Sequence, residues 1–331
     1  MFLRLNKNLE AKDQKVAVVT GSSTGIGFET CLLFARNGIL TYATMRDLTK
    51  ADLIQNIAEK EKLPLKVIQM DVDKDDSVVR AFKEISEDHE TGMRIDILVN
   101  NAGFGLFGAL EDQSIEHIKK QFETNLFGAI RTIQQVLPIM RNQRSGVVIN
   151  ISSISGQIGF PAQPVYVSTK FALEGLSESF AYEVQPYGIS VILIEPGVIN
   201  TNFVENIMIP FNTQRISSHL LSPSTDSASQ TVTYSGGAES NGEMTAYANV
   251  VERFLRHYYP AMRNAPSPKE VAKVLLESIN DSVISSTRQG GSNNNNFYRH
   301  PVGEDAKLYA DAKRKMGDSE LHSFVAKGIL S

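Results

Sequence analysis

Short apolar runs rich in Val and Ile alternate with longer amphipathic patterns through the first two thirds of the chain. Turn residues and then a helical pattern follow each run. Runs of this kind are typical of strands buried on both faces, and their alternation with helices indicates a parallel sheet covered on either side. The six runs are 16–20, 40–45, 65–70, 95–100, 147–151 and 191–195.

Two helices are predicted to be long. Ser114 is placed to cap one that runs to about residue 141, and the other covers about 165–187, before the breakers Pro186 and Gly188. At 331 residues, the chain fits one α/β domain with an elaborated end.

That domain divides into three parts. Residues 15–201 form the core, and 202–265 form a substrate loop or lid, because 202–249 is rich in Ser, Thr and Gly. Residues 266–331 hold an amphipathic helix over 266–280, a short strand over 297–302 and a charged helix from about residue 304.

The composition is that of an ordinary globular protein, with 42% hydrophobic residues, 21% charged residues and a net charge of -4. This balance favours neither nucleic acid nor an anionic membrane as a partner. The lone Cys31 excludes a disulfide within the chain and is interpreted as a small buried residue. No apolar run is long enough to span a bilayer, and the first fifteen residues lack the apolar core of a signal peptide, so we predict a cytoplasmic protein. The six histidines are scattered, and no metal site is predicted.

A glycine-rich turn, TGSSTGIG, joins the first strand directly to a helix. Glycine permits a tight turn and the approach of a pyrophosphate to the amides at the helix N-terminus. The residues predicted to hold a dinucleotide here are Gly21, Ser23, Thr24, Gly25, Ile26 and Gly27. The same letters satisfy the G-x-S-x-G elbow of esterases, but a hydrolase elbow follows several strands and needs downstream Asp and His partners.

The end of the second strand separates NAD from NADP, because an acidic residue there binds the ribose hydroxyls. This strand ends at Met45 and is followed by Arg46, whose guanidinium can pair with a 2′-phosphate. NADP(H) is therefore favoured. NAD(H) stays open because Asp47 follows.

Further polar and small residues follow the third and fourth strands. Asp71 and Val72 are predicted to lie at the adenine, and Asn101, Ala102 and Gly103 to let the cofactor lie close to the backbone. Read singly, such residues are a helix cap and a turn. In order, they line the crevice at the carboxyl ends of the strands.

The strongest motif is Tyr166 with Lys170 four residues later, and Ser153 thirteen residues before the tyrosine. Residues i and i+4 share a helix face, so the ammonium is expected beside the phenol. A nearby cation favours the phenolate, and such tuning would let tyrosine act as a general acid or base.

In full order, TGSSTGIG, NNAG, NISSISG, YVSTK and EPG resemble the short-chain dehydrogenase/reductase family over about residues 16–201. YATMRDL, NAGFGLFGALE and STKFALEGLSESFA are most similar to its 17β-hydroxysteroid dehydrogenase type 1 and retinol dehydrogenase branch. The resemblance implies a doubly wound Rossmann-type sheet of about seven strands in the order 3-2-1-4-5-6-7. It also implies NADP(H)-dependent interconversion of an apolar alcohol with its ketone or aldehyde, and a homodimer or homotetramer formed through the two long helices.

The resemblance also assigns roles to residues. Tyr166 would transfer the proton and Ser153 would bond the substrate oxygen. Lys170 would lower the pKa of the tyrosine and hold the nicotinamide ribose, while Asn125 would position a water. Thr24 would help to bind a 2′-phosphate. The loop expected to receive the carboxamide contains Pro196, Gly197, Val198 and Thr201.

Apolar residues near these motifs are candidates for a substrate cleft, although each could equally be core. They are Phe104, Leu106, Ile154, Phe160, Val198 and Phe203. Two other functions remain open: an NAD-dependent dehydrogenase of a smaller or polar alcohol, and a dinucleotide-sensing protein without turnover.

Overall fold

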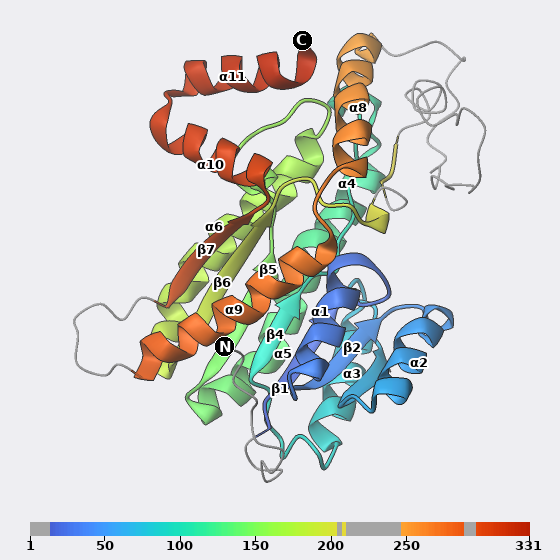
Figure 1. Cartoon of the computed structure of the whole chain (residues 1–331), viewed down its shortest axis with the longest axis vertical. Helices are drawn as coiled ribbons and strands as arrows, with labels where there is room; N and C mark the ends of the chain where they lie inside the picture. The colour runs from blue at the N-terminus through green and yellow to red at the C-terminus, as the bar shows by residue number, and fades with distance from the viewer. Residues whose placement is uncertain (1–13, 204–206, 210–245, 288–295) are drawn as a thin grey trace.

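The computed structural model describes residues 14–203, 207–209, 246–287 and 296–331, of which 281–287 are described by their backbone alone. Seven parallel strands form one sheet in the order β3-β2-β1-β4-β5-β6-β7, which confirms the predicted fold (Figure 1). The strands are β1 (Val16–Thr20), β2 (Leu40–Met45), β3 (Leu65–Gln69), β4 (Ile97–Asn100), β5 (Gly146–Ile151), β6 (Ile189–Pro196) and β7 (Phe297–Val302).

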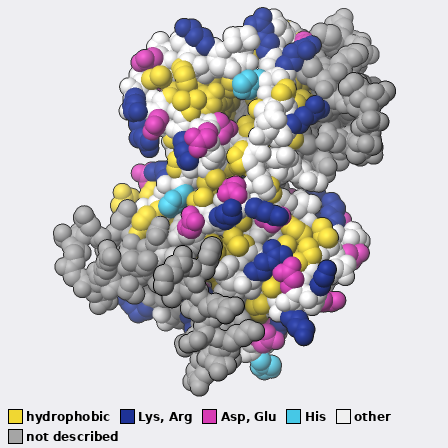
Figure 2. Space-filling view, in the orientation of Figure 1, with side chains coloured by type: hydrophobic (Ala, Val, Ile, Leu, Met, Phe, Trp, Pro, Cys, Tyr) yellow, Lys and Arg dark blue, Asp and Glu magenta, His cyan; other side chains and the backbone are white. Residues whose placement is uncertain are grey.

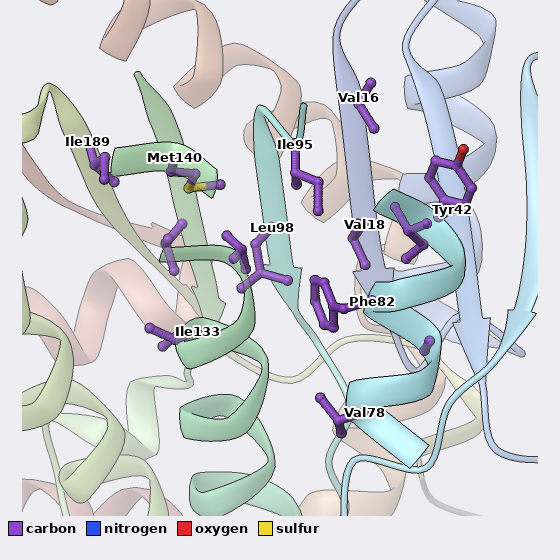
Figure 3. Packing of buried hydrophobic residues seen from close by; sticks show 14 of the residues in the cluster. Val16, Val18, Tyr42, Val78, Phe82, Ile95, Leu98, Ile133, Met140 and Ile189 are labelled. Carbon is purple, nitrogen blue, oxygen red and sulfur yellow. The ribbon is translucent and has the colours of Figure 1, made fainter. Parts of the chain in front are cut away.

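Helices cover both faces of this sheet. One face carries α3 (Asp75–Glu87), α5 (Gly128–Gln143) and α6 (Pro164–Val184). The other carries α1 (Gly25–Arg36), α2 (Asp52–Glu61) and α9 (Pro268–Thr287). Figure 3 shows the first of these layers, where Phe82 of α3 lies beside Val18 and Leu98 of the central strands and Val78 belongs to the same apolar cluster. Buried strands of this kind need apolar side chains on both faces, which is why β1, β5 and β6 are rich in Val and Ile.

The first predicted long helix contains an irregular turn. Ser114 caps it by accepting a hydrogen bond from the His117 backbone amide. After α4 (Ile115–Phe122), five residues (Glu123–Phe127) form a π-helical turn before α5 continues the helix. Such turns are frequent at functional sites, and this one contains Asn125.

A helix that the sequence analysis did not assign lies within the range predicted as a lid. It is α8 (Ala248–Arg263), and with α10 (Glu304–Lys315) and α11 (Asp318–Leu330) it forms what we call the C-terminal cap (Figure 1). A third apolar cluster joins the cap to residues near the carboxyl ends of the strands. The rest of the predicted lid, residues 204–206 and 210–245, lies outside the described residues.

On the face shown in Figure 2, basic and acidic side chains of the described residues are interspersed, with apolar side chains visible between them. No helix among the described residues is long and apolar enough to cross a membrane. Burial raises the pKa of the Cys31 thiol to about 12, against a weaker opposing effect of its hydrogen bond to Ser22, so this thiol is a packed, inert group.

Candidate active site

A cavity of about 480 Å³ lies at the carboxyl ends of β1 to β4, where the glycine-rich turn meets the N-terminus of α1. This volume suits a small-molecule site. Twelve of the residues predicted to bind the cofactor line it: Gly21, Ser23, Thr24, Gly25, Ile26, Arg46, Asp71, Val72, Asn101, Ala102, Gly103 and Thr201. Phe104 and Phe203, predicted at the substrate, also line it.

The turn at the start of α1 is shaped for close approach. Gly21 has φ +67°, and a Cβ on it would come 2.8 Å from the Ala102 Cα. Thr24 is the N-cap residue, yet its side chain makes no capping hydrogen bond, and the first turn of α1 contains no acid. An anion is therefore favoured at this helix end by the free amides and the dipole.

Gly27 and Asn101, both predicted at the cofactor, pack against each other and against the glycine-rich turn. The Asn101 side-chain amide donates to the carbonyl oxygens of Thr20 (2.9 Å) and Gly21 (3.0 Å). A Cβ on Gly27 would come 2.5 Å from that amide nitrogen and from the Gly21 oxygen. Gly27 does not line the cavity; it allows the turn, strand β4 and α1 to meet.

Several lining residues were missed by the sequence analysis: Met45, Lys50, Met70, Asp73, Lys120, Thr124 and Met208. Lys120 and Thr124 lie four residues apart on the helix that leads to Asn125, so they share its face. Their i, i+4 spacing just before Asn125 was the available signal.

Ser153, Tyr166 and Lys170 are brought together by β5 and α6. Ser153 caps a short 3₁₀ helix, Ile154–Gly156, just after β5, and lies close enough to the Tyr166 phenol to act on its pKa. Lys170 lies one turn along α6, with its Nζ atom 5.8 Å from the centroid of the Tyr166 ring. That Nζ atom donates to the Ile151 carbonyl at 2.7 Å. All three residues are buried.

The electrostatics differ from the expectation for the tyrosine. Burial raises the pKa of Tyr166 to about 12, and Ser153 opposes this only in part. Burial also lowers the pKa of Lys170 to about 8, while the Glu174 carboxylate acts to raise it. The structure thus shows no lowering of the Tyr166 pKa by Lys170, because desolvation dominates at both groups.

Both the oxygen and the nitrogen of the Asn125 side-chain amide make hydrogen bonds within the protein. Its Oδ1 atom accepts from the Phe104 backbone N–H at 3.0 Å, and its Nδ2 atom donates to the Phe104 carbonyl (3.0 Å) and to Thr169 Oγ1 (3.1 Å). Thr169 lies next to Lys170 on α6. Asn125 therefore ties the π turn to the loop after β4 and to the helix with Tyr166.

Aromatic rings lie beside Tyr166, either directly or packed on Phe107. Phe107 lies edge-on to Tyr166, with centroids 6.0 Å apart, and to Phe254 and Tyr258 of α8, at 5.5 and 5.3 Å. Phe203, predicted at the substrate, lies 6.0 Å from Tyr166. The sequence analysis missed Phe107, Phe254 and Tyr258, which are ordinary aromatic residues without a motif.

The other predicted substrate residues divide into two groups. Ile154, Phe160 and Val198 belong to the apolar cluster that contains Tyr166. Leu106 is fully buried in a β-bridge with Met208 and is core. Pro196 ends β6, and Gly197 and Val198 follow it; all three lie outside the lining of the cavity. Ser153 Oγ donates to the Pro196 carbonyl at 3.4 Å.

Comparison with known proteins defines the class of this chain. The family model for short chain dehydrogenases matches residues 15–209, and the chain belongs to that family. It is 33% identical over 298 residues to the uncharacterized oxidoreductase YusZ of Bacillus subtilis, covering 89% of this chain and 91% of that protein.

Two further relatives lie in the branch that the motifs indicated. Bovine (Bos taurus) retinol dehydrogenase 8 is 34% identical, covering 80% of this chain and 78% of its own. Mouse (Mus musculus) 17-beta-hydroxysteroid dehydrogenase type 1 is 32% identical, covering 81% and 71%. Among solved structures, a short-chain dehydrogenase from Streptomyces avermitilis has a TM-score of 0.70 at 26% identity, covering 96% of this chain and 99% of that one. These findings confirm the family and its branch.

Proposed function

We propose that the protein is an NADP(H)-dependent oxidoreductase that interconverts an apolar alcohol and its ketone or aldehyde, with Tyr166 as general acid and base. The observation that carries this proposal is the buried group of Ser153, Tyr166 and Lys170, in which Ser153 acts to lower the pKa of the phenol and the Lys170 Nζ atom lies 5.8 Å from its ring. A nucleophile elbow is not supported, since no histidine among the described residues lines the cavity that contains Ser23.

The cavity fits a dinucleotide by its chemistry. The N-terminus of α1 offers amides to a pyrophosphate, and the small residues after β4 leave room beside the backbone. The nicotinamide of such a cofactor supplies or accepts the hydride. Lys170, Thr201 and the loop after β6 would hold its nicotinamide end.

The proton would move at the Tyr166 hydroxyl. With the pKa of this phenol near 12, Tyr166 is a proton donor at neutral pH, as reduction of a carbonyl requires. Ser153 would donate to the same substrate oxygen as negative charge develops. In the oxidative direction the ammonium of Lys170 would stabilise the phenolate. Asn125 holds the backbone around this site and would position a water for proton relay.

The preference for NADP(H) rests on the rim of the cavity beyond β2. Arg46 and Lys50 contribute two cations there, and both are exposed. The one neighbouring acid, Asp47, is engaged: its carboxylate accepts from the backbone and side chain of Thr49 at 3.0 and 2.7 Å. Those hydrogen bonds, the side-chain bond first, lower the pKa of Asp47. A 2′-phosphate would therefore meet two cations, while Asp47 is less available to ribose hydroxyls.

An apolar substrate is supported by the rings beside Tyr166. Phe107 and Phe203 lie 6.0 Å from the Tyr166 ring, and Phe254 and Tyr258 pack on Phe107, so the surroundings of the phenol are apolar. Two of the relatives are named for apolar alcohols, retinol and a 17-beta-hydroxysteroid. Phe127 and Phe171, 46% and 44% exposed at the long helices, support the further proposal of self-association there.

The experiment is a screen of apolar ketones and aldehydes against oxidation of NADPH, followed by Tyr166→Phe. Loss of the proton donor should lower kcat about 10³-fold and leave the dissociation constant of NADPH within about threefold. Activity retained in the variant would refute the assigned role. Tight NADPH binding with no turnover across the panel would instead favour a sensing protein.

Cofactor choice is tested by Arg46→Ala. Removing one bidentate phosphate contact should weaken NADPH binding about tenfold while NADH binding changes less than twofold. Lys119→Ala, a charge removed from α4 outside the cavity, is the matched control. Equal changes for both cofactors would remove the basis for NADP preference.

A further inference from the structure

The loop after β6 is held by the C-terminal part of the chain. The Gly197 backbone N–H donates to the Val302 carbonyl at 2.9 Å, and the Val198 N–H donates to Asp305 Oδ2 at 2.7 Å. Val302 ends β7, and Asp305 lies in the first turn of α10. Two successive amides of the loop are thus bound by residues about a hundred positions later.

The approach of the Asp305 carboxylate to the loop is close enough to require glycine. A Cβ on Gly197 would collide with both carboxylate oxygens of Asp305. Gly303 has φ +103°, and a Cβ there would lie 2.7 Å from Asp305 Oδ1. Glycine on both sides leaves room for this side chain, and the N-terminus of α10 favours its negative charge.

The same helix contacts the other side of the site. One turn after Asp305, Tyr309 lies edge-on to Phe160 with centroids 5.0 Å apart. Phe160 belongs to the segment that joins Ser153 to Tyr166. One face of α10 therefore contacts both the loop after β6 and the segment between the two hydroxyl residues. Helix α10 lies beyond the residues that the family model matches.

We propose that Asp305 is a positioning residue that fixes the Gly197–Val198 backbone where the nicotinamide end of the dinucleotide binds. The inference rests on the proposed function. A fixed loop limits the orientations of the nicotinamide, so Asp305 acts on hydride-transfer geometry without contact to the phosphates. The C-terminal cap is in this way coupled to the cofactor as well as to the substrate.

The test compares whole and truncated cofactor. Asp305→Ala should weaken NADPH binding about tenfold and lower kcat, while binding of 2′-phospho-ADP-ribose, which lacks the nicotinamide, changes less than twofold. Asp305→Asn keeps an oxygen that can accept from Val198 and should restore NADPH affinity to within about threefold. Asp311→Ala, an exposed acid of α10 paired with Arg314, is the matched control and should change neither ligand.

Three results would overturn the proposal: equal weakening of both ligands by Asp305→Ala, unchanged NADPH binding, or no rescue by asparagine. If Asp305→Ala does not fold, Gly197→Ala, which crowds the same carboxylate, is measured in its place with the same expected discrimination. If the wild type binds neither NADPH nor 2′-phospho-ADP-ribose, the proposed function itself is contradicted. This result is obtained before any variant is made.

Discussion

The cofactor cavity and the C-terminal cap are built by different means. The cavity includes glycines and short polar side chains at the ends of strands, some of which make directional contacts, such as Asn101 to Thr20 and Gly21. The cap is made of apolar helix faces, where Phe254, Tyr258 and their neighbours fill space around Tyr166. Directional contacts leave a motif in the sequence, whereas packing leaves only hydrophobic periodicity.

This contrast predicts separable effects of substitution. A change in the cavity should alter dinucleotide binding, whatever the substrate. A change in the cap should alter stability and substrate range while dinucleotide affinity persists. The loop held by Asp305 is the proposed exception that joins the two regions.

The largest effect is expected from Phe254→Ala in the cap. Phe254 is 3% exposed and packs on Phe107 and Tyr258, so truncation should cost about 3–5 kcal/mol of unfolding free energy. Urea unfolding measures this loss, with Leu308→Ala, at a residue 55% exposed, as the control. The folded variant should bind NADPH normally and show a changed KM for apolar ketones. A large loss of NADPH affinity would break the comparison.

A smaller effect is expected from Asn101→Ala in the cavity. The variant loses two part-buried hydrogen bonds from its side chain to the glycine-rich turn, so the free energy of unfolding should fall by about 1–3 kcal/mol. The affinity for NADPH should fall whichever substrate is used, because the turn proposed to receive the pyrophosphate is loosened. The control is Asn37→Ala, an exposed asparagine with one local hydrogen bond to Leu33, which should change stability by less than about 0.5 kcal/mol. Normal NADPH titrations for Asn101→Ala would contradict the role of the turn.

The success of prediction from the sequence also differs between the cavity and the C-terminal cap. The strand order was implied by the family resemblance. Most of the cavity lining was predicted, since residues such as Gly21 and Arg46 stand directly after buried strands. Helix α8 was not predicted because a polar stretch precedes it and no cap or motif marks its start. The Tyr166 pKa was expected to be lowered, yet it is raised, because the sequence shows the neighbouring Lys170 but not the depth of burial.

A pH-dependent effect is expected at the border of the two regions, where β6 meets β7. Glu195 is fully buried there, accepts from Gln157 at 2.6 Å, and lies near Glu174 and Arg299. Burial, and then the Glu174 charge, raises the pKa of Glu195 to about 7, although Gln157 and Arg299 act to lower it. The folded protein therefore keeps a proton that the unfolded chain releases near its ordinary value of 4.5.

A carboxyl group with a raised pKa contributes stability that is complete below about pH 4.5 and is lost as pH rises through 7. Between these limits the unfolding free energy of the wild type should fall by up to about 1.4 kcal/mol per pH unit from this group. Glu195→Gln cannot ionise, so its profile should be flatter by that slope, with the two proteins converging at low pH. Urea unfolding at half-unit pH steps measures the difference. Glu178→Gln, which removes an exposed partner of Arg299, controls for the nearby charge, and a slope unchanged by Glu195→Gln would show that this carboxyl is ionised at neutral pH beside Arg299.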